Sequence, residues 1–254
     1  LDDEANPDQY AAFAEGYKVY FDPSTRFMRG LDSEGNWRTP FNPRASNHRN
    51  DDYCEGTAWQ WTWFVPHDVD GLVELMGGRD AFIGKLDSLF TADSKLEGES
   101  TSVDISGLIG QYAHGNEPSH HIAHLYNYVG QPWRTQEIVD EVLHTLYFNN
   151  PDGLSGNEDC GQMSAWYILN AMGFYQVCPG KPVYSIGRPL FNEATVHLKD
   201  GKSFKVIAHN NSRDNKYVRS IVLNGNKLET PFFTHQDIVD GGTLELTMGS
   251  EPLK

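Results

Sequence analysis

The run DCGQMSAWYILNAMGF at residues 159–174 predicts a helix over residues 159–172, because its apolar residues recur at helical spacing and Gly173 follows as a left-handed cap. The same criteria predict helices at residues 9–17, 55–65, 68–76, 79–90, 118–129 and 135–148. No strand pattern separates these segments, so we expect antiparallel helical pairs joined by polar loops.

The pattern changes after about residue 182. Segments 194–198, 204–210, 218–223 and 243–248 alternate and are rich in Val, Ile, Thr and Phe, which is typical of strands. The dipeptides Asp200-Gly201 and Asn224-Gly225 are typical of hairpin turns. We therefore expect a mainly α fold, with a helical portion at residues 1–182 and a small antiparallel β module at residues 183–254.

The composition excludes several classes of protein. Of the 254 residues, 39% are hydrophobic, which is enough for a sizeable core and argues against disorder. No apolar run approaches the roughly 20 residues of a membrane-spanning helix. The 20 basic and 35 acidic residues give a net charge of −15, which repels phosphate backbones and argues against nucleic acid as a partner.

Two features bear on the compartment. The chain opens with Leu1-Asp2-Asp3-Glu4, which lacks the basic and apolar regions of a signal peptide, so a mature product and an excised fragment both fit. The three cysteines, Cys54, Cys160 and Cys178, are an odd number without metal-site spacing, and we expect buried free thiols. Neither feature fixes the localisation.

The first candidate site is the run DDYCEGTAWQWTW at residues 51–63. We expect Glu55 to open a helix with Trp59 one turn along the same face, where the indole would raise the carboxyl pKa and prepare a general acid. The helix N-terminus favours the anion and opposes this shift. The alternative is a helix-end glutamate beside core tryptophans, since the tryptophans suit a core as well as carbohydrate stacking.

The second candidate site is the run GQYAHGNEPSHHIAH at residues 110–124. Glu117, His121 and His124 fall at i, i+4 and i+7, a spacing that would suit zinc. Asn116 and Glu117, with loop carbonyls, instead offer the hard oxygen ligands that calcium prefers. A purely structural polar loop is the third alternative.

The third candidate site is the run NPDGLSGNEDCGQMSAWY at residues 150–167. A glycine-rich turn brings Glu158 and Asp159 to a helix start, where the backbone amides favour an ionised base or cation ligand. The alternative is a helix cap, with Asp159 and Gln162 in a capping box. A protonation-prone glutamate and an ionised aspartate, each after a polar loop, form the layout of a two-carboxylate glycosidase.

Parts of these runs (residues 54–61, 115–121 and 156–167), in this order and with VPHD at residues 65–68, resemble glycoside hydrolase family 92. The similarity covers most of residues 10–200. It implies a calcium-dependent, exo-acting α-mannosidase that inverts the anomeric centre. It also implies an N-terminal β-sandwich and an (α/α)6 toroid, with the active site between them.

The resemblance also implies roles for individual residues. Glu55 would be the general acid and Asp159 the general base that activates water, with Asn157 or Glu158 beside it. In an inverting enzyme the two carboxyl groups lie about 6.5–9.5 Å apart. The residues implied to contact mannose are Trp59, His114, Asn116, Glu117 and His120, and those implied to hold Ca2+ are Glu117, Asn116 and Asp159.

The chain departs from this architecture in size. About seven predicted helices stand where the toroid needs twelve, and no N-terminal β-sandwich is evident. We expect the C-terminal part of an enzyme that acts on mannose-containing glycans in an extracytoplasmic setting. Its partner would be the missing N-terminal half or a second copy that covers open helix faces. The isolated chain should hydrolyse mannosides poorly, and a non-catalytic carbohydrate-binding module is the alternative.

Overall fold

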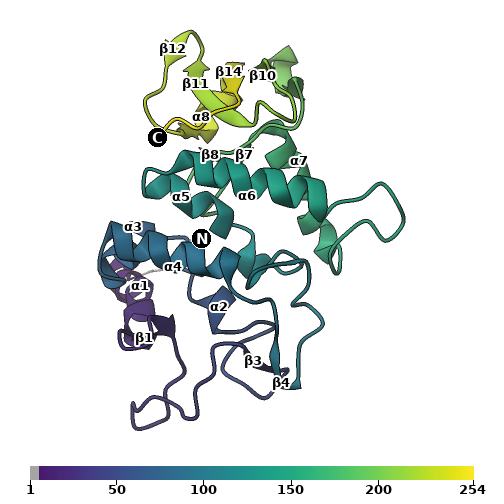
Figure 1. Cartoon of the computed structure of the whole chain (residues 1–254). Helices are drawn as coiled ribbons and strands as arrows, with labels where there is room; N and C mark the ends of the chain where they lie inside the picture. The colour runs from purple at the N-terminus through teal and green to yellow at the C-terminus, as the bar shows by residue number, and fades with distance from the viewer. Residues whose placement is uncertain (1–5) are drawn as a thin grey trace. The chain divides into compact units, whose positions relative to one another are not determined.

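Figure 1 shows the computed structural model of the chain, which describes residues 6–254. The chain divides into two compact units, Leu1–Ala113 and His114–Lys254, each with its own buried residues. Among residues 6–254, no helix has both the length and the apolar surface needed to cross a bilayer. The domain boundary between a helical portion at residues 1–182 and a β module at residues 183–254 stays a prediction.

The first unit combines short helices with small sheets. Its helices are α1 (Pro7–Ala14), α2 (Ala58–Trp61), α3 (Val69–Leu75) and α4 (Arg79–Thr91), with a 3-10 helix η1 at Gly16–Tyr20. Its strands pair as β1 (Phe21–Asp22) with β2 (Phe27–Met28), β3 (Ala45–Asn47) with β4 (Glu97–Ser100), and β5 (Leu108–Ile109) with β6 (Tyr112–Ala113). The sequence predicts helices joined by polar loops in this part of the chain, and most of these short strands lie in the predicted loops.

Helices α3 and α4 agree with the helices predicted at residues 68–76 and 79–90. Gly77 and Gly78 separate them with φ angles of +98° and +95°, in the left-handed region where a helix ends and glycine is favoured. The apolar positions of α4 then recur at i, i+4 and i+7, and the side chains there are fully buried: Phe82, Leu86 and Leu89. Local periodicity is enough to define this pair of helices.

The polar segment at residues 24–52 is organised by a buried ion pair. Arg29 Nη1 lies 2.7 Å from Asp22 Oδ2, and Arg29 Nη2 donates to the carbonyl of Arg38 at 2.7 Å. The guanidinium carbon lies 4.4 Å from the ring centroid of Phe41, a cation–π contact. Burial opposes the charged carboxylate, yet hydrogen bonds from Ser24 and Arg29 hold the pKa of Asp22 well below its usual range.

The second unit contains more regular elements. Its helices are α5 (Leu125–Tyr128), α6 (Pro132–Thr145), α7 (Gln162–Met172) and α8 (His235–Val239), with 3-10 helices η2 (Glu117–Ser119), η3 (Ile122–His124), η4 (Asp159–Gly161) and η5 (Lys199–Gly201). Its strands are β7 (Phe174–Tyr175), β8 (Val183–Ile186), β9 (Glu193–His197), β10 (Ser203–His209), β11 (Tyr217–Leu223), β12 (Asn226–Lys227), β13 (Phe232–Thr234) and β14 (Gly242–Gly249).

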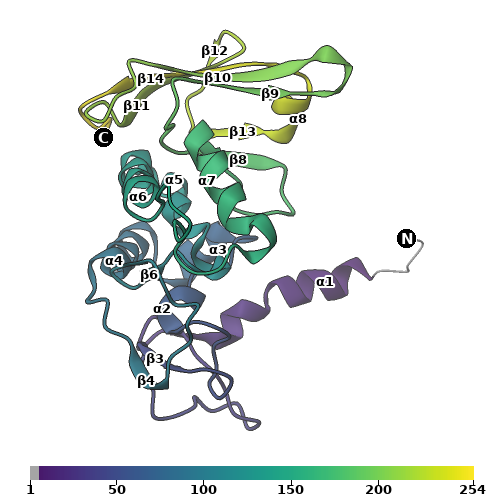
Figure 2. The ribbon, with the colours of Figure 1, turned by 90° about the vertical axis from the view of Figure 1, so that its right-hand side faces the viewer.

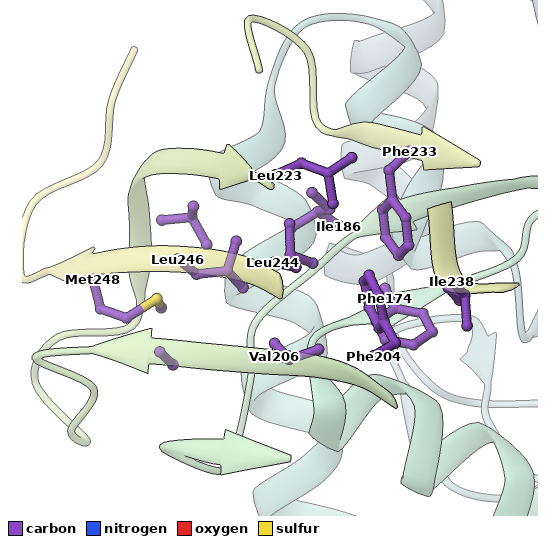
Figure 3. Close-up of a cluster of buried hydrophobic side chains, with 12 residues drawn as sticks. Phe174, Ile186, Phe204, Val206, Leu223, Phe233, Ile238, Leu244, Leu246 and Met248 are labelled. Carbon is purple, nitrogen blue, oxygen red and sulfur yellow. The ribbon is translucent and has the colours of Figure 1, made fainter. Parts of the chain in front are cut away.

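The strands form a five-stranded sheet, β12-β11-β14-β10-β9, and a three-stranded sheet, β13-β8-β7. Figure 2 shows the larger sheet lying over β8, β13 and α7. Alternate residues of β10 and β14 point to one buried face, where Phe204 and Leu244 meet Phe174 of β7 and Ile186 of β8 (Figure 3). Strand β7 directly follows α7, so this core fixes the C-terminal end of that helix.

One strand pair corrects the prediction of an antiparallel module. Strands β10 and β14 run parallel, with Phe204 opposite Gly242 and His209 opposite Thr247. The chain between them passes through β11, β12, β13 and α8, which is the long crossover that a parallel pair requires. The other pairs of the five-stranded sheet are antiparallel, as predicted.

Two predicted helices are much shorter than expected. The segment predicted as a helix over 118–129 consists of η2, η3 and the single turn α5. The segment predicted as a helix over 55–65 is reduced to α2, because Thr57 rather than Glu55 caps it. The (α/α)6 toroid stays a prediction of the family resemblance.

Candidate active site

The candidate base lies in a strained turn just before α7. Asp159 and Cys160 have φ angles of +52° and +54°, which are uncommon for residues other than glycine. Glu158 holds the turn against α7, since its carboxylate accepts hydrogen bonds from the Ser164 amide and hydroxyl, both at 3.0 Å. Gly161 is the N-cap residue of α7, and Glu158 rather than Asp159 accepts from a first-turn amide, which corrects the predicted capping box. Asp159 is left half-buried and Asn157 exposed.

A buried histidine network supports the start of α7. His120 Nε2 lies 2.9 Å from the carbonyl of His114, and its Nδ1 lies 3.0 Å from Gln162 Nε2. The carbonyl of His120 accepts a hydrogen bond from Trp166 Nε1 at 2.9 Å. Burial lowers the pKa of His120 to about 4, so the imidazole is neutral near pH 7.

His114 lies deeper in the same network. Its side chain is fully buried, and its Nε2 lies 2.7 Å from the hydroxyl of Tyr147, which donates to the carbonyl of Met163 at 3.1 Å. The imidazole meets the Trp166 ring edge-on at 4.3 Å. Burial holds the pKa of His114 well below its usual value. Contact of His114 and His120 with mannose stays a prediction.

Asn116 and Glu117 open the neighbouring 3-10 helix η2. Asn116 Oδ1 accepts a hydrogen bond from the Glu117 amide at 3.2 Å, and the Glu117 side chain is exposed. Burial raises the pKa of Tyr175, and the negative charge of Glu117 adds to this shift. The hydrogen bonds of His120 with Gln162 and Trp166 bring the second and third sequence motifs together.

The structure does not form the zinc arrangement considered for Glu117, His121 and His124. These residues lie in or next to two separate 3-10 helices and do not share one helical face. His124 is fully buried, with Nδ1 3.0 Å from Ser185 Oγ and Nε2 2.9 Å from Asn170 Oδ1. Within residues 6–254, no three side chains among His, Cys, Asp and Glu are grouped to hold a metal.

The candidate acid lies in a turn of the first unit. Glu55 is exposed and has a φ angle of +50°, again in the left-handed region. The helix after it begins at Ala58, where Thr57 and Gln60 form a capping box. Trp61 Nε1 donates to the carbonyl of Cys54 at 2.8 Å and so fastens the turn to α2. The prediction that Glu55 opens this helix is wrong.

Trp59 is half-buried in an aromatic contact of the first unit. Its ring meets Phe27 edge-on at 4.9 Å, and Lys85 Nζ lies 4.6 Å from its centroid. Trp59 therefore packs within this unit, as the core alternative expects. Contact between Trp59 and mannose stays a prediction.

Comparison with known proteins decides the family. The model of the glycosyl hydrolase family 92 catalytic domain matches residues 1–250. The chain belongs to this family. It is 43% identical to a family GH92 α-mannosidase of Bacteroides thetaiotaomicron solved in complex with mannoimidazole, with a TM-score of 0.89 over 97% of this chain and 33% of that one.

Two other known proteins are similar to this chain. A family GH92 inverting mannosidase of the same bacterium is 42% identical, with a TM-score of 0.83 over 96% of this chain and 34% of that one. An uncharacterized secreted glycosidase of Arthroderma benhamiae is 32% identical over 200 residues, which are 78% of this chain and 24% of that protein. The chain thus spans about a third or less of the length of these relatives.

The three cysteines of this family member are free, as predicted, but none of them is fully buried. Cys54 and Cys160 are exposed and Cys178 is half-buried. Cys54 precedes Glu55 and Cys160 follows Asp159, so each exposed thiol lies in one of the two strained turns.

The roles of Gln162, Tyr147 and Tyr175 in the histidine network are not predicted from the sequence. We interpreted Gln162 as part of a helix cap, whereas it bonds to His120 and to Tyr175. The only sequence signal is the proximity of Gln162 to Asp159, because Tyr147 and Tyr175 reach the network through the fold. Glu55 and Asp159 belong to different units, and their arrangement across a sugar stays a prediction.

The partial burial of Lys85 predicts an unusual dependence of stability on pH. Burial, followed by the charge of Arg26, lowers the pKa of Lys85 to about 7. An unfolded lysine has a pKa of about 10.4. Between pH 7 and that value the unfolded chain binds more protons than the folded chain, so the free energy of unfolding should rise with pH. We expect the urea midpoint to rise from pH 7 to pH 9.5, and to rise less in Lys85→Met. An equal rise in both proteins would contradict the assignment.

Proposed function

We propose that this chain provides both carboxylates of an inverting exo-α-mannosidase that removes terminal α-linked mannose from glycans. Membership of family 92 and the similarity to two mannosidases support a glycosidase. The observation that carries the proposal is the left-handed turn at Asp159 and Cys160, held by Glu158 beside the His120 network. Strained turns of this kind cluster at active sites, where the surrounding structure holds a side chain in place.

In this proposal the two carboxyl groups have separate tasks. Glu55 protonates the leaving glycosidic oxygen, and Asp159 removes a proton from a water on the opposite face of the sugar. Glu158 acts on Asp159 through the turn, because its own oxygens are bonded to Ser164. Asn157 is exposed beside this turn and is the remaining candidate to assist the base.

The residues expected to hold calcium have suitable chemistry. Glu117 and Asp159 offer carboxylate oxygens, the hard ligands that calcium prefers, and Asn116 offers an amide oxygen already bonded to the Glu117 amide. When bound, Ca2+ would supply a positive charge that coordinates vicinal hydroxyl groups of the sugar and stabilises negative charge on oxygen. Glu117 and Asp159 would hold the ion, and Asn116 would orient Glu117.

We also infer that the chain acts together with an N-terminal portion, because it spans about a third of its mannosidase relatives. The name of the Arthroderma benhamiae relative, an uncharacterized secreted glycosidase, supports an extracytoplasmic setting.

The test compares the isolated chain with the chain joined to an N-terminal portion taken from a family relative. We expect weak or absent hydrolysis of α-linked mannobioses by the chain alone and efficient hydrolysis by the joined protein, with loss of activity after calcium chelation. Proton NMR of the first product should show β-mannose, the inverted anomer. Retention of the α anomer, or wild-type-like turnover by the isolated chain, would contradict the proposal. Binding without turnover by the joined protein would favour a carbohydrate-binding module.

A further inference from the structure

A chain of hydrogen bonds fixes the orientation of the Gln162 side-chain amide. It runs from the backbone carbonyl of His114 through the His120 ring to Gln162. The carbonyl of His114 can only accept a hydrogen bond, so His120 Nε2, 2.9 Å away, carries the proton. His120 is only 2% exposed, which favours the neutral ring and leaves Nδ1 as an acceptor. The Gln162 atom that lies 3.0 Å from Nδ1 is therefore the amide nitrogen.

The same nitrogen determines the hydrogen bonding of Tyr175. Gln162 Nε2 lies 3.2 Å from the hydroxyl of Tyr175, so the phenol oxygen accepts this bond and its own proton points elsewhere. Both N–H groups of Gln162 are then used, which leaves its Oε1 as an unused acceptor. Within residues 6–254, neither Gln162 Oε1 nor the Tyr175 proton has a protein partner.

These two atoms complement one kind of ligand group. Gln162 is half-buried and its Oε1 reaches solvent, while 8% of Tyr175 remains exposed. A hydroxyl both donates and accepts, so one hydroxyl can donate to Gln162 Oε1 and accept from Tyr175. A carbonyl or carboxylate ligand could use only the tyrosine, and an ammonium only the amide oxygen.

We propose that Gln162 and Tyr175 form a hydroxyl-binding pair that takes one ring hydroxyl of the pyranoside bound beside Asp159. The inference rests on the proposed function for the identity of the sugar, and on the hydrogen bonds above for the pair itself. Its place follows from the fold, since Gln162 begins α7 three residues after Asp159 and Tyr175 lies in β7, which directly follows the same helix.

Monodeoxy sugars provide the test. Methyl α-D-mannopyranoside and its four monodeoxy analogues are titrated by calorimetry, with calcium present, into the wild-type chain and into Tyr175→Phe. The substitution keeps the ring and removes only the hydroxyl. We expect it to weaken binding of the parent sugar by about 3–10-fold, the range for one neutral hydrogen bond. For the one analogue that lacks the bound hydroxyl, affinity should be the same in both proteins.

Two further measurements separate the possible outcomes. Nitrogen-15 NMR should show the Nε2-protonated tautomer of His120 in the wild type and in Tyr175→Phe, and a changed pattern in Gln162→Glu, which loses both amide donors. An equal loss of affinity for every analogue, no loss for the parent sugar, or no binding of any sugar to the wild type would overturn the pair. If methyl α-D-glucopyranoside and its deoxy analogues gave the same dependence of affinity on Tyr175, and the glucoside bound more tightly than the mannoside, the hydroxyl-binding pair would stand. The mannosidase proposal would then be contradicted.

Discussion

Replacing Asp159 with asparagine is expected to lower the rate of α-mannoside hydrolysis by about 10²–10⁴-fold, the contribution that a positioned base makes. Asparagine keeps the size of the side chain and one oxygen for the calcium ion, but it cannot accept the proton of water. The effect should fall on kcat more than on KM, since the sugar contacts remain. The assay uses the chain joined to an N-terminal portion, with initial rates measured on α-linked mannobioses.

Glu158→Gln is the matched control, because the two carboxylates are adjacent in one turn. The introduced glutamine would keep one oxygen for Ser164 and so preserve most of the cap. We expect a smaller loss of rate together with a measurable loss of thermal stability. Equal losses of rate in the two variants would mean that Glu158 shares the role of base, and an unaltered rate in Asp159→Asn would exclude the assigned mechanism.

A small anion offers a second readout for the same residue. Azide needs no base to become a nucleophile, and Asp159→Gly leaves space for it where the aspartate and water stood. We expect azide to restore part of the activity of Asp159→Gly and to yield the β-mannosyl azide. Glycine also suits the φ angle of +52° at this position, so the turn should survive the substitution.

The sequence predicts those elements whose signals are local. The helices α3 and α4 follow from apolar periodicity and the Gly77-Gly78 break, and the four longer strands of the larger sheet follow from alternation. The start of α2 had a local signal as well, since Thr57 and Gln60 have capping-box spacing. The helix starts after Thr57 and not at Glu55 because the Thr57 hydroxyl and the Gln60 side chain supply the capping hydrogen bonds.

Other features depend on contacts between distant parts of the chain. The segment at residues 118–129 breaks into short turns while His124 bonds to Asn170 and Ser185, partners supplied by other elements. The side chain of Gln162 does not cap the helix as expected but bonds to His120, which lies 42 residues away in sequence. The parallel pairing of β10 with β14 is likewise set by the packed core. Local spacing contains none of this information.

The buried ion pair of the second unit predicts the largest effect on stability. Arg188 is 2% exposed, and its Nε lies 2.9 Å from Asp140 Oδ1 without the alignment of a hydrogen bond. Its other nitrogens donate to the carbonyls of Pro189 and Ser212, which ties α6 to two loops of the sheet region. Burial lowers the pKa of Arg188, and the Asp140 charge offsets part of that cost.

Asp140→Ala should therefore lower the free energy of unfolding by about 3–5 kcal/mol, because it leaves a buried guanidinium without a counter-charge. Urea unfolding followed by circular dichroism measures this loss. Arg213→Ala is the matched control: its guanidinium lies 3.7 Å from the same carboxylate but its side chain is 64% exposed, so removing it should cost less than about 1 kcal/mol. The double variant Asp140→Leu/Arg188→Met should recover much of the lost stability, since it removes both charges and keeps apolar volume. A loss below that of Arg213→Ala would show that Asp140 does not stabilise Arg188.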